Sequence, residues 1–280
     1  MKNVLTLAFL LMVGTITAQI ETPAPSPAAT VEQVVGLTTI TVDYSRPSMR
    51  DRAIFAEDGL VPFGKIWRTG ANAATKITFS DDVTVNGEAL KGGSYAILAT
   101  PDADMWTVNF YAFEARGFGS YVEKTPDASV TAKVNKMEGM NLESFTISFH
   151  DLTTNTATLN FGWEKTWVSL DLEVEVDERV LGSIEAVMAG PSNNDYFAAA
   201  SYYHTAGKDL NQALEWINKA TSGDSPRFWQ VRRKALILYD MGKTSDAIAA
   251  AKQSLSLAQE AGNSDYVRMN EKSIAEWEKM

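Results

Sequence analysis

The sequence contains no cysteine and only two histidines, and both shortages narrow the chemistry that is open to the protein. Without cysteine there is no disulfide, no thiolate metal site and no lipid attached through a cysteine at the end of an export signal. Basic residues are also scarce, since 25 Lys and Arg face 35 Asp and Glu, for a formal net charge of −10. Nucleic-acid binding needs a concentrated basic face. The composition therefore argues against a nucleic-acid partner, and we expect neither a cofactor nor a metal.

Long apolar runs are absent too, apart from one at the N-terminus. There, Lys2 precedes an apolar stretch over residues 4–13, and small residues around Ala18 offer a cleavage site. This pattern is typical of a secretory signal peptide, which we place at residues 1–18. The stretch is shorter than the roughly 20 residues of a membrane-spanning helix, so we expect no transmembrane segment in the mature chain. The expected location is periplasmic or secreted.

The chain is long enough for two domains, because it has 280 residues and domains cluster at roughly 100 to 150 residues. After the signal, residues 19–36 begin with proline alternating with small residues, which favours extended, unpacked backbone. We interpret them as a Pro/Ala-rich linker. The hydrophobic period then changes once, near Asp177. This change predicts a β domain over residues 37–177 and an α-helical domain over residues 178–280.

The first domain alternates apolar and polar residues, the period of half-buried strands. Trp106, Val108 and Phe110, for example, point to one face, and the residues between them point to the other. The pattern predicts nine strands, at residues 37–43, 75–80, 82–86, 93–99, 105–111, 130–136, 143–150, 156–163 and 166–176. Asn86-Gly87 between two of them is a strong hairpin signal. We predict an antiparallel β-sandwich followed by helices, an α+β fold with two domains.

The loops of this domain carry a family resemblance. The string Trp67-Arg68-Thr69-Gly70-Ala71-Asn72 is too unusual to be an accidental turn, and three further pieces accompany it, at residues 44–48, 90–95 and 163–166. Together they resemble the domain of unknown function 2911 family, found in envelope proteins of Bacteroidetes-type bacteria, over about residues 39–171. The resemblance implies a β-rich extracytoplasmic domain. It supplies no catalytic residue and does not reach the C-terminal region.

The C-terminal region has helical periodicity and an internal repeat. Apolar residues recur at helical spacing over residues 180–188, and Gly190-Pro191 then ends the first helix. Farther on, Ala213 is followed by an equivalent Ala247, 34 residues later, in similar surroundings. A period of that length is typical of tetratricopeptide repeats. We therefore predict a short tetratricopeptide-like domain that binds another envelope protein or packs on the β domain.

Two loops of the β domain, one at residues 44–55 and one that starts at residue 61, also hold the candidate binding residues. Five basic residues lie between positions 46 and 68: Arg46, Arg50, Arg52, Lys65 and Arg68. If the loops meet, their arginines could bind an acidic or glycan ligand through forked hydrogen bonds, with Trp67 as a stacking face. The candidate ligand-binding residues are Arg46, Ser48, Trp67, Arg68, Thr69, Asn72 and Glu164. Alternatively, Arg46 and Arg68 pair with acidic residues such as Asp43 or Glu164 and cap loop carbonyls, which pins the loops, while Trp67 belongs to the core.

The remaining polar residues do not form a catalytic or metal-binding set. His150 lies on the polar face of a predicted strand, but the adjacent Asp151 points to the opposite face and cannot orient its ring. His204 lies in a helical segment beside two tyrosines, where we expect an interhelical position. Asp102 and Asp104 lack the glycine turn and the distal glutamate of a calcium loop. We predict no catalytic residue and no metal ligand.

Three functional hypotheses follow, the third being a purely structural envelope component with no ligand and a constitutive assembly. The leading one is a non-enzymatic binding or scaffolding protein of the cell envelope, with an Arg/Trp loop on its β domain and a helical domain for protein interaction. The alternative is an enzyme or ligand sensor that acts on an acidic or glycan-type ligand through Arg46, Arg68 and Glu164.

Overall fold

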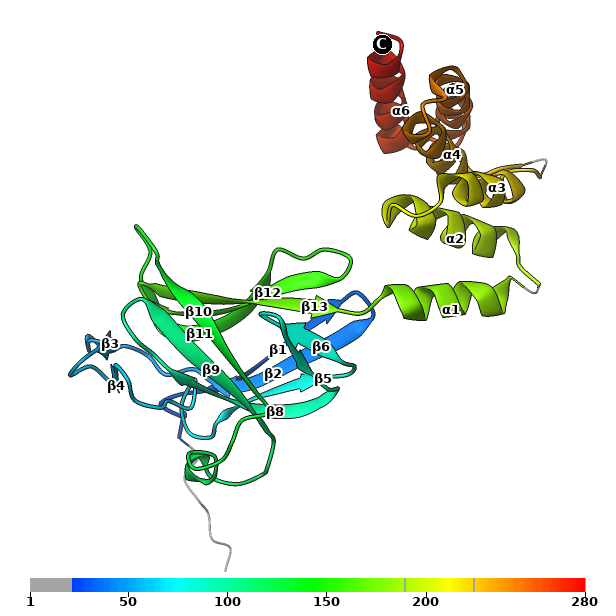
Figure 1. Cartoon of the computed structure of the whole chain (residues 1–280). Helices are drawn as coiled ribbons and strands as arrows, with labels where there is room; N and C mark the ends of the chain where they lie inside the picture. Colours follow the sequence, from blue (N-terminus) through cyan, green and yellow to red (C-terminus); the bar gives the residue numbers. More distant parts are fainter. Residues whose placement is uncertain (1–21, 189, 224, 280) are drawn as a thin grey trace, which may run out of the picture. The chain divides into compact units, whose positions relative to one another are not determined.

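The computed structural model describes residues 22–188, 190–223 and 225–279. They form two compact units, a β unit that ends at Val176 and a helical unit that starts at Asp177 (Figure 1). The α+β order, a β domain followed by helices, is therefore confirmed. The predicted signal peptide, residues 1–18, lies outside the described residues. No helix in the described part of the chain is long and apolar enough to cross a membrane.

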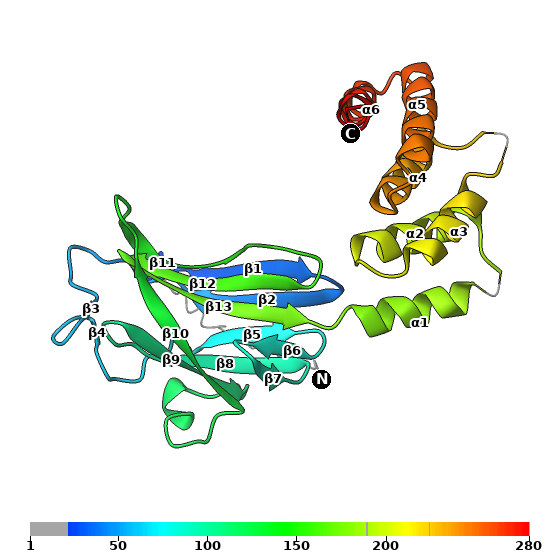
Figure 2. The same cartoon turned by 45° about the horizontal axis from the view of Figure 1, so that its top comes forward.

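The β unit is an 11-stranded antiparallel sheet that curls around its own core (Figures 1 and 2). Its strands are β1 Ala28–Val35, β2 Thr38–Ser45, β5 Thr75–Phe79, β6 Val83–Val85, β7 Glu88–Leu90, β8 Gly93–Thr100, β9 Met105–Ala112, β10 Ala128–Lys136, β11 Leu142–His150, β12 Thr156–Glu164 and β13 Thr166–Val174. A short parallel pair, β3 Phe55–Ala56 and β4 Val61–Pro62, and one 3-10 turn, η1 Phe118–Ser120, complete the unit.

The sheet almost closes into a barrel. Its strand order is β1-β2-β5-β8-β9-β10-β13-β12-β11, and β6 pairs with both β13 and β7. β10 bends between two neighbours, because residues 128–133 pair with β9 and residues 134–136 pair with β13. The segment that follows β2 pairs with β11, the last strand in this order. The N–H of Met49 donates to the C=O of Glu143, and the N–H of Phe145 donates to the C=O of Pro47. The antiparallel β prediction is confirmed, but as one nearly closed sheet in place of two separate ones.

The alternation of apolar and polar residues along the strands produces this core, because every second side chain points to the same face. Trp106, Val108 and Phe110 are each at most 1% exposed, as their predicted common face requires. Asn86 and Gly87 form the predicted hairpin turn between β6 and β7, with φ of 46° and 87°. Two successive positive φ values match the twist of the strands that such a turn joins.

One prediction has to be corrected. The linker does not extend to residue 36, because Ala28–Val35 forms β1 and pairs with β2 over its whole length. Its side chains alternate between exposed and half-buried positions, with only Val35 buried. A strand that buries so little lacks the strong apolar alternation by which the other strands were recognised. The proline-rich part ends at Pro27.

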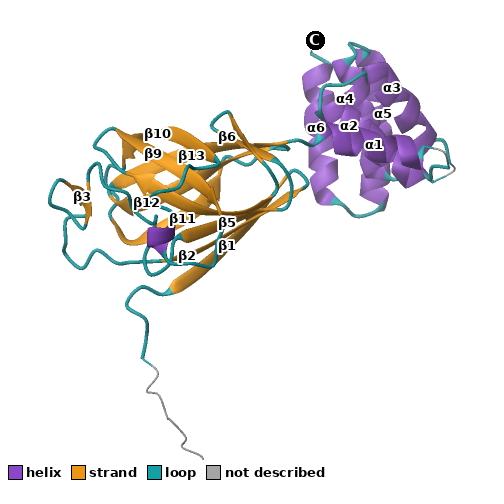
Figure 3. Cartoon of the chain, turned by 60° about the horizontal axis from the view of Figure 1, so that its bottom comes forward, coloured by secondary structure: helices purple, strands orange, loops and turns teal. Residues whose placement is uncertain are grey.

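The helical unit consists of α1 Asp177–Val187, α2 Asn193–Thr205, α3 Leu210–Ala220, α4 Phe228–Asp240, α5 Thr244–Glu260 and α6 Ser264–Trp277. These helices are purple in Figure 3. α2 packs on α3, α4 packs on α5, and α6 packs on α5. Short turns join each of these pairs, so the chain forms two helix hairpins followed by a closing helix.

The turns of the helical unit repeat one geometry. Gly207, Gly242 and Gly262 follow α2, α4 and α5 with φ of 62°, 76° and 68°. In each turn, the N–H of the residue after the glycine bonds to the C=O five residues earlier. This is the hydrogen bond of a glycine C-cap, which satisfies a carbonyl at the helix end. Three helix ends are therefore fixed in the same way.

Small residues repeat at the contacts between the helices. Ala213 and Ala247 are both fully buried. Ser254 is fully buried as well, and Ala220 is only 3% exposed. Each pair is separated by 34 residues and occupies equivalent places in α3 and α5. The repeat noticed in the sequence therefore corresponds to equivalent buried positions in two successive hairpins.

Candidate functional site

A pocket of about 420 Å³ opens in the β unit where two loops meet. One loop follows β2, and the other runs from β4 to β5. The polar and aromatic residues that line the pocket are Ser26, Ser48, Arg50, Arg52, Trp67, Arg68, Asn72 and Trp163. We call it the arginine pocket. The two loops singled out in the sequence thus lie together.

Both loops contain residues in the left-handed backbone region. Arg50 has φ of 50° in the first loop, while Thr69 and Asn72 have φ of 51° and 61° in the second. Such conformations cost energy for residues other than glycine and persist only where the surroundings impose them. Gly70 has φ of 151°, and a Cβ there would lie 3.0 Å from the backbone oxygen of Ser45. The loops therefore hold one defined conformation.

The Arg68 guanidinium is held by one hydrogen bond and one aromatic ring. Its Nη1 donates to the backbone oxygen of Asn72, and its guanidinium lies over the ring of Phe118, 4.7 Å from the centroid. The amide of Asn72 in turn donates to Ser45 Oγ (3.1 Å) and to the backbone oxygen of Ser26 (3.2 Å). The bond to Asn72, a residue of the same loop, therefore fixes the position of the guanidinium relative to that loop.

The other two arginines are also held by backbone carbonyls. Arg52 donates from Nε to Met49 O (2.8 Å) and from Nη2 to Ser48 O (2.7 Å). Arg50 donates from Nη2 to Pro25 O (3.0 Å). Carbonyl oxygens carry no net charge, so these bonds orient the guanidinium groups without neutralising them.

The pocket is therefore electropositive. None of its arginines forms an ion pair with a carboxylate in the described part of the chain, and its lining includes no Asp or Glu. Glu143 lies nearby, but its Oε1 accepts from the backbone N–H of Arg50 (3.0 Å). Three like charges gathered in one concavity favour an anion, and arginine forks bind carboxylate or phosphate oxygens in pairs.

Trp67 belongs both to the pocket wall and to the core. Its indole Nε1 donates to Gly70 O (3.0 Å), which fixes the second loop. Its ring packs edge-on against Phe145 (5.0 Å between centroids) and stacks against Trp163 (6.0 Å). The ring is half-buried, so part of it faces the pocket. Trp67 therefore packs on the core, as one of the two interpretations from the sequence requires, and its role as a stacking face for a ligand stays a prediction.

Four of the seven predicted site residues line the pocket, namely Ser48, Trp67, Arg68 and Asn72. Arg46 does not, because it donates from Nε to Phe145 O (3.0 Å) and from Nη2 to Thr146 Oγ1 (2.7 Å). These bonds join the end of β2 to β11. Arg46 is therefore a structural residue, although its partners are not the carboxylates considered from the sequence.

Thr69 and Glu164 also lie away from the pocket lining. Thr69 is fully buried, and its backbone oxygen accepts from the hydroxyl of Thr75. Glu164 lies at the β12–β13 turn with φ of 56°, opposite Leu142 in the strand register. Its neighbour Trp163 lines the pocket instead. The structure therefore places Glu164, the carboxylate predicted for the site, outside the pocket lining.

Arg50, Arg52 and Trp163 line the pocket although the sequence did not place them in the site. The two arginines belong to the basic cluster between positions 46 and 68, so charge clustering alone could have found them. Trp163 is 1% exposed, and its Nε1 donates to Glu143 O (3.2 Å). It meets the loops only because the sheet closes, a contact that local sequence does not encode.

The histidines lie elsewhere. Nε2 of His150 lies 2.9 Å from Oγ of Ser148 on the exposed face of β11. Asp151 follows the end of β11, and its carboxylate accepts from the Thr158 hydroxyl (3.1 Å). His204 bonds to Asp240 (2.7 Å) on another helix. In the described residues no group of three or more His, Asp or Glu is placed to hold a metal ion.

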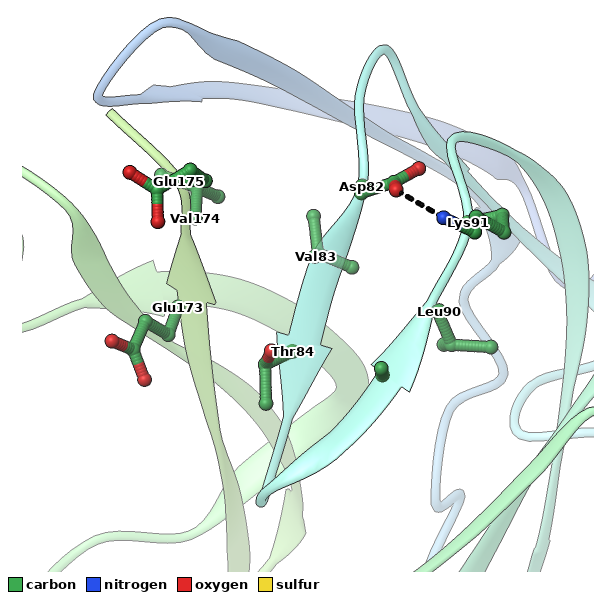
Figure 4. Close-up of a pocket in the computed structure, with 9 residues that line it drawn as sticks. Asp82, Val83, Thr84, Leu90, Lys91, Glu173, Val174 and Glu175 are labelled. Carbon is green, nitrogen blue, oxygen red and sulfur yellow. Dashed lines mark hydrogen bonds and ion pairs between the residues drawn. The ribbon is translucent and has the colours of Figure 1, made fainter. Parts of the chain in front are cut away.

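A second pocket, of about 280 Å³, lies between the β6–β7 hairpin and β13 and has the opposite charge (Figure 4). Asp82, Glu173 and Glu175 line it together with Lys91. Lys91 donates to Asp82 (2.7 Å) and so holds the pKa of that carboxyl below its ordinary value. The lysine is thus already engaged, and the acidic residues around it offer no basis for binding an anion.

Comparison with known proteins gives a family and nothing more specific. Residues 26–172 match the family model described as "Protein of unknown function (DUF2911)". The match spans the β unit from just before β1 to within β13 and includes both loops of the arginine pocket. No curated protein and no solved structure is significantly similar to the chain.

Proposed function

The chain belongs to the DUF2911 family of proteins of unknown function, and from that premise we propose that it is an exported, non-enzymatic binding protein whose β domain takes a small anion in the arginine pocket. The observation that carries this proposal is that three arginines line one concavity, that their guanidinium groups bond to carbonyl oxygens, and that the lining contains no Asp or Glu. A ligand with two or more anionic oxygens would meet donors that are already oriented. Small carboxylates and phosphate fit that description.

The chemistry of the lining favours binding over catalysis. It contains no Asp, Glu, His or Lys side chain that could exchange a proton with a substrate. The guanidinium group remains protonated at any ordinary pH and cannot act as a base. The alternative in which Glu164 acts as acid or base is not supported, because Glu164 does not line the pocket. The proposal is therefore recognition of an anion without chemical conversion.

The helical unit is proposed to be tetratricopeptide-like and to bind another envelope protein. Two successive helix hairpins, equivalent small residues 34 residues apart and a closing helix support this assignment. The location is proposed to be the periplasm or the exterior. That part rests on the signal-like residues 1–18 in the sequence.

Thermal melts with added anions test the pocket. The wild-type protein is melted with inorganic phosphate, citrate or glucuronate, alongside Arg68→Gln and Lys65→Gln. Lys65 is the matched control, because it is an exposed cation of the same loop that does not line the pocket. A ligand at 100 times its Kd should stabilise the protein by about 2.7 kcal/mol. Loss of the Arg68 fork should weaken binding roughly 10- to 100-fold.

Two outcomes count against the proposal. One is that none of these anions shifts the wild-type melt. The other is that Lys65→Gln weakens binding as much as Arg68→Gln does, which would indicate attraction by general charge and not by a built pocket. Retained binding in Lys65→Gln and loss in Arg68→Gln support the arginine pocket as the site.

A further inference from the structure

The N-terminal segment of the described chain lies against the arginine pocket. Residues 22–27, which we call the strap, precede β1 and read Thr-Pro-Ala-Pro-Ser-Pro. Pro25 and Ser26 are part of the pocket lining. Arg50 Nη2 donates to Pro25 O (3.0 Å), and Asn72 Nδ2 donates to Ser26 O (3.2 Å). Two donors of the pocket are therefore occupied by the chain itself.

The composition of the strap suits this contact. Pro23, Pro25 and Pro27 have no backbone N–H, so at these positions the strap presents carbonyl acceptors only. Acceptors are what arginine and asparagine donors require. Proline also restricts the unbound backbone, which lowers the entropy lost when the strap is held. The strap therefore offers to the pocket the same kind of atom, an electron-rich oxygen, that an anion would offer.

The strap is weakly held in spite of these bonds. Its residues are exposed, apart from the half-buried Ser26. The N–H of Arg46 donates to Pro27 O (2.9 Å), which continues the β1–β2 ladder and anchors the strap at that end. Between Thr22 and Ser26, the hydrogen bonds to the pocket are the main attachment. An anion forms stronger hydrogen bonds with Arg50 than a neutral carbonyl does.

We propose that the strap, anchored at Pro27, is a tethered competitor: its residues 22–26 occupy donors of the arginine pocket, and a bound anion displaces them. This inference rests on the proposed function of the pocket and adds its regulation. Because the strap is covalently attached, it competes at a fixed effective concentration. The apparent Kd for the anion is then the intrinsic Kd divided by the fraction of molecules in which the strap has left. Anything that holds the strap elsewhere opens the site.

Removing the strap tests the competition. Phosphate and citrate binding is measured by calorimetry for residues 19–280 and for residues 27–280, which keep Pro27 and its bond to β2. The shorter chain should bind roughly three- to tenfold more tightly, as expected if one or two such hydrogen bonds favour the closed strap. The double substitution Pro23→Ala, Pro25→Ala keeps the length of the strap but loosens it. It should give an intermediate affinity.

The position of the strap is read directly by fluorescence. Because the chain has no cysteine, Ala24→Cys can be labelled at one site with bimane, a fluorophore that contact with tryptophan quenches. Trp67 in the pocket lining is the expected quencher. The label should be quenched in the free protein, and phosphate or citrate should restore its emission over the same concentration range as binding.

The outcomes separate this inference from the proposed function. Equal affinity of the two chains, or tighter binding by the longer one, overturns the competitor role and leaves the anion site intact. Unchanged quenching at saturating anion also overturns it. If neither chain binds either anion, the proposed function falls, and the competitor role falls with it. Tighter binding by the shorter chain together with restored emission supports both.

Discussion

At the scale of single residues, the arginines of the two loops divide into two roles. Arg46 has its guanidinium bonded to Phe145 and Thr146 of β11, so it joins strands. Arg50, Arg52 and Arg68 are bonded to carbonyls of loops and of the strap, and they face the pocket. Similar side chains in one short stretch of sequence therefore serve stability in one case and presentation of charge in the others.

This division predicts opposite behaviour for two matched substitutions. Arg46→Gln should lower the free energy of unfolding by about 1–3 kcal/mol, because two hydrogen bonds from a half-buried charged group are lost. Its anion affinity should stay within about twofold of wild type, since Arg46 does not touch the pocket. Urea unfolding measures the first quantity, and phosphate titration measures the second.

The matched substitution is Arg68→Gln, for which we expect a large loss of affinity for phosphate. If Arg46→Gln weakened phosphate binding as strongly as Arg68→Gln while remaining folded, the separation of roles would be wrong. If it left the unfolding midpoint unchanged, the bonds between Arg46 and β11 would contribute nothing to stability.

The two loops singled out in the sequence both line the arginine pocket, but the sequence did not indicate every residue of its lining. Trp67, Arg68 and Asn72 were found because they belong to an unusual, locally specified string, and local strings report on local structure. Glu164 is a carboxylate within a family motif, yet the direction of its side chain depends on the β12–β13 turn, where Glu164 itself has φ of 56°. Trp163, one residue earlier, faces the pocket instead. Neighbouring residues of a strand point to opposite faces of the sheet, so charge alone could not show whether residue 163 or residue 164 faces the pocket.

At the scale of elements, the helical unit depends on its glycine turns. Gly207→Ala or Gly242→Ala should each destabilise the helical unit by about 1 kcal/mol, because alanine is strained at φ of 62° or 76°. No neighbouring atom lies within 4 Å of a Cβ built at either position, so strain and not collision is the cause. Helical ellipticity followed through urea unfolding measures the change.

A third glycine provides the control. Gly182 lies within α1, has no positive φ and also has open space around a built Cβ. Gly182→Ala should raise stability by about 0.5–1 kcal/mol, because alanine is the better helix former. Loss of stability in all three variants would show that the glycines matter through some property other than backbone conformation.

Strands with a strong alternation of apolar and polar residues were predictable, whereas β1 and the very short strands β3, β4 and β7 were not predicted. The nine expected strands correspond to strands of the structure because each has a buried face, as in β13, whose side chains alternate along its length. β1 was missed because it buries only Val35 and follows a proline-rich segment. Its place in the sheet depends on pairing with β2, so the tertiary partner decides its structure.

At the scale of the whole molecule, one change of period near Asp177 was enough to predict two units. The closure of the sheet was not predictable in the same way. It depends on hydrogen bonds such as that between Met49 and Glu143, which lie far apart in sequence. Closure is also what brings Trp163 to the two loops, so the global fold completes a site whose charged residues are local.

The distribution of charge predicts how the whole chain responds to acid. Hydrogen bonds hold the pKa of five carboxyls below their ordinary values: Asp82, Glu114, Asp177, Asp195 and Glu215. A carboxyl whose pKa is lower in the folded state contributes stability above its unfolded pKa and loses it as the pH falls. Stability should therefore change little from about pH 7 to 5 on account of these groups. It should decline as the pH falls below the ordinary values of 4.5 for Glu and 3.8 for Asp.

The Asp177–Lys208 pair allows this mechanism to be tested within one unit. The largest cause of the lowered pKa of Asp177 is the hydrogen bond from Lys208, followed by that from Tyr202. Lys208→Gln should therefore be less stable than wild type at pH 7, and the difference should shrink as Asp177 becomes protonated below about pH 3.8. Lys243→Gln is the control, because Lys243 is exposed at the start of α5. Its difference from wild type should not depend on pH in this range. Urea midpoints from helical ellipticity between pH 7 and pH 3 measure both, and a Lys208→Gln difference that stayed constant with pH would contradict the role of Asp177.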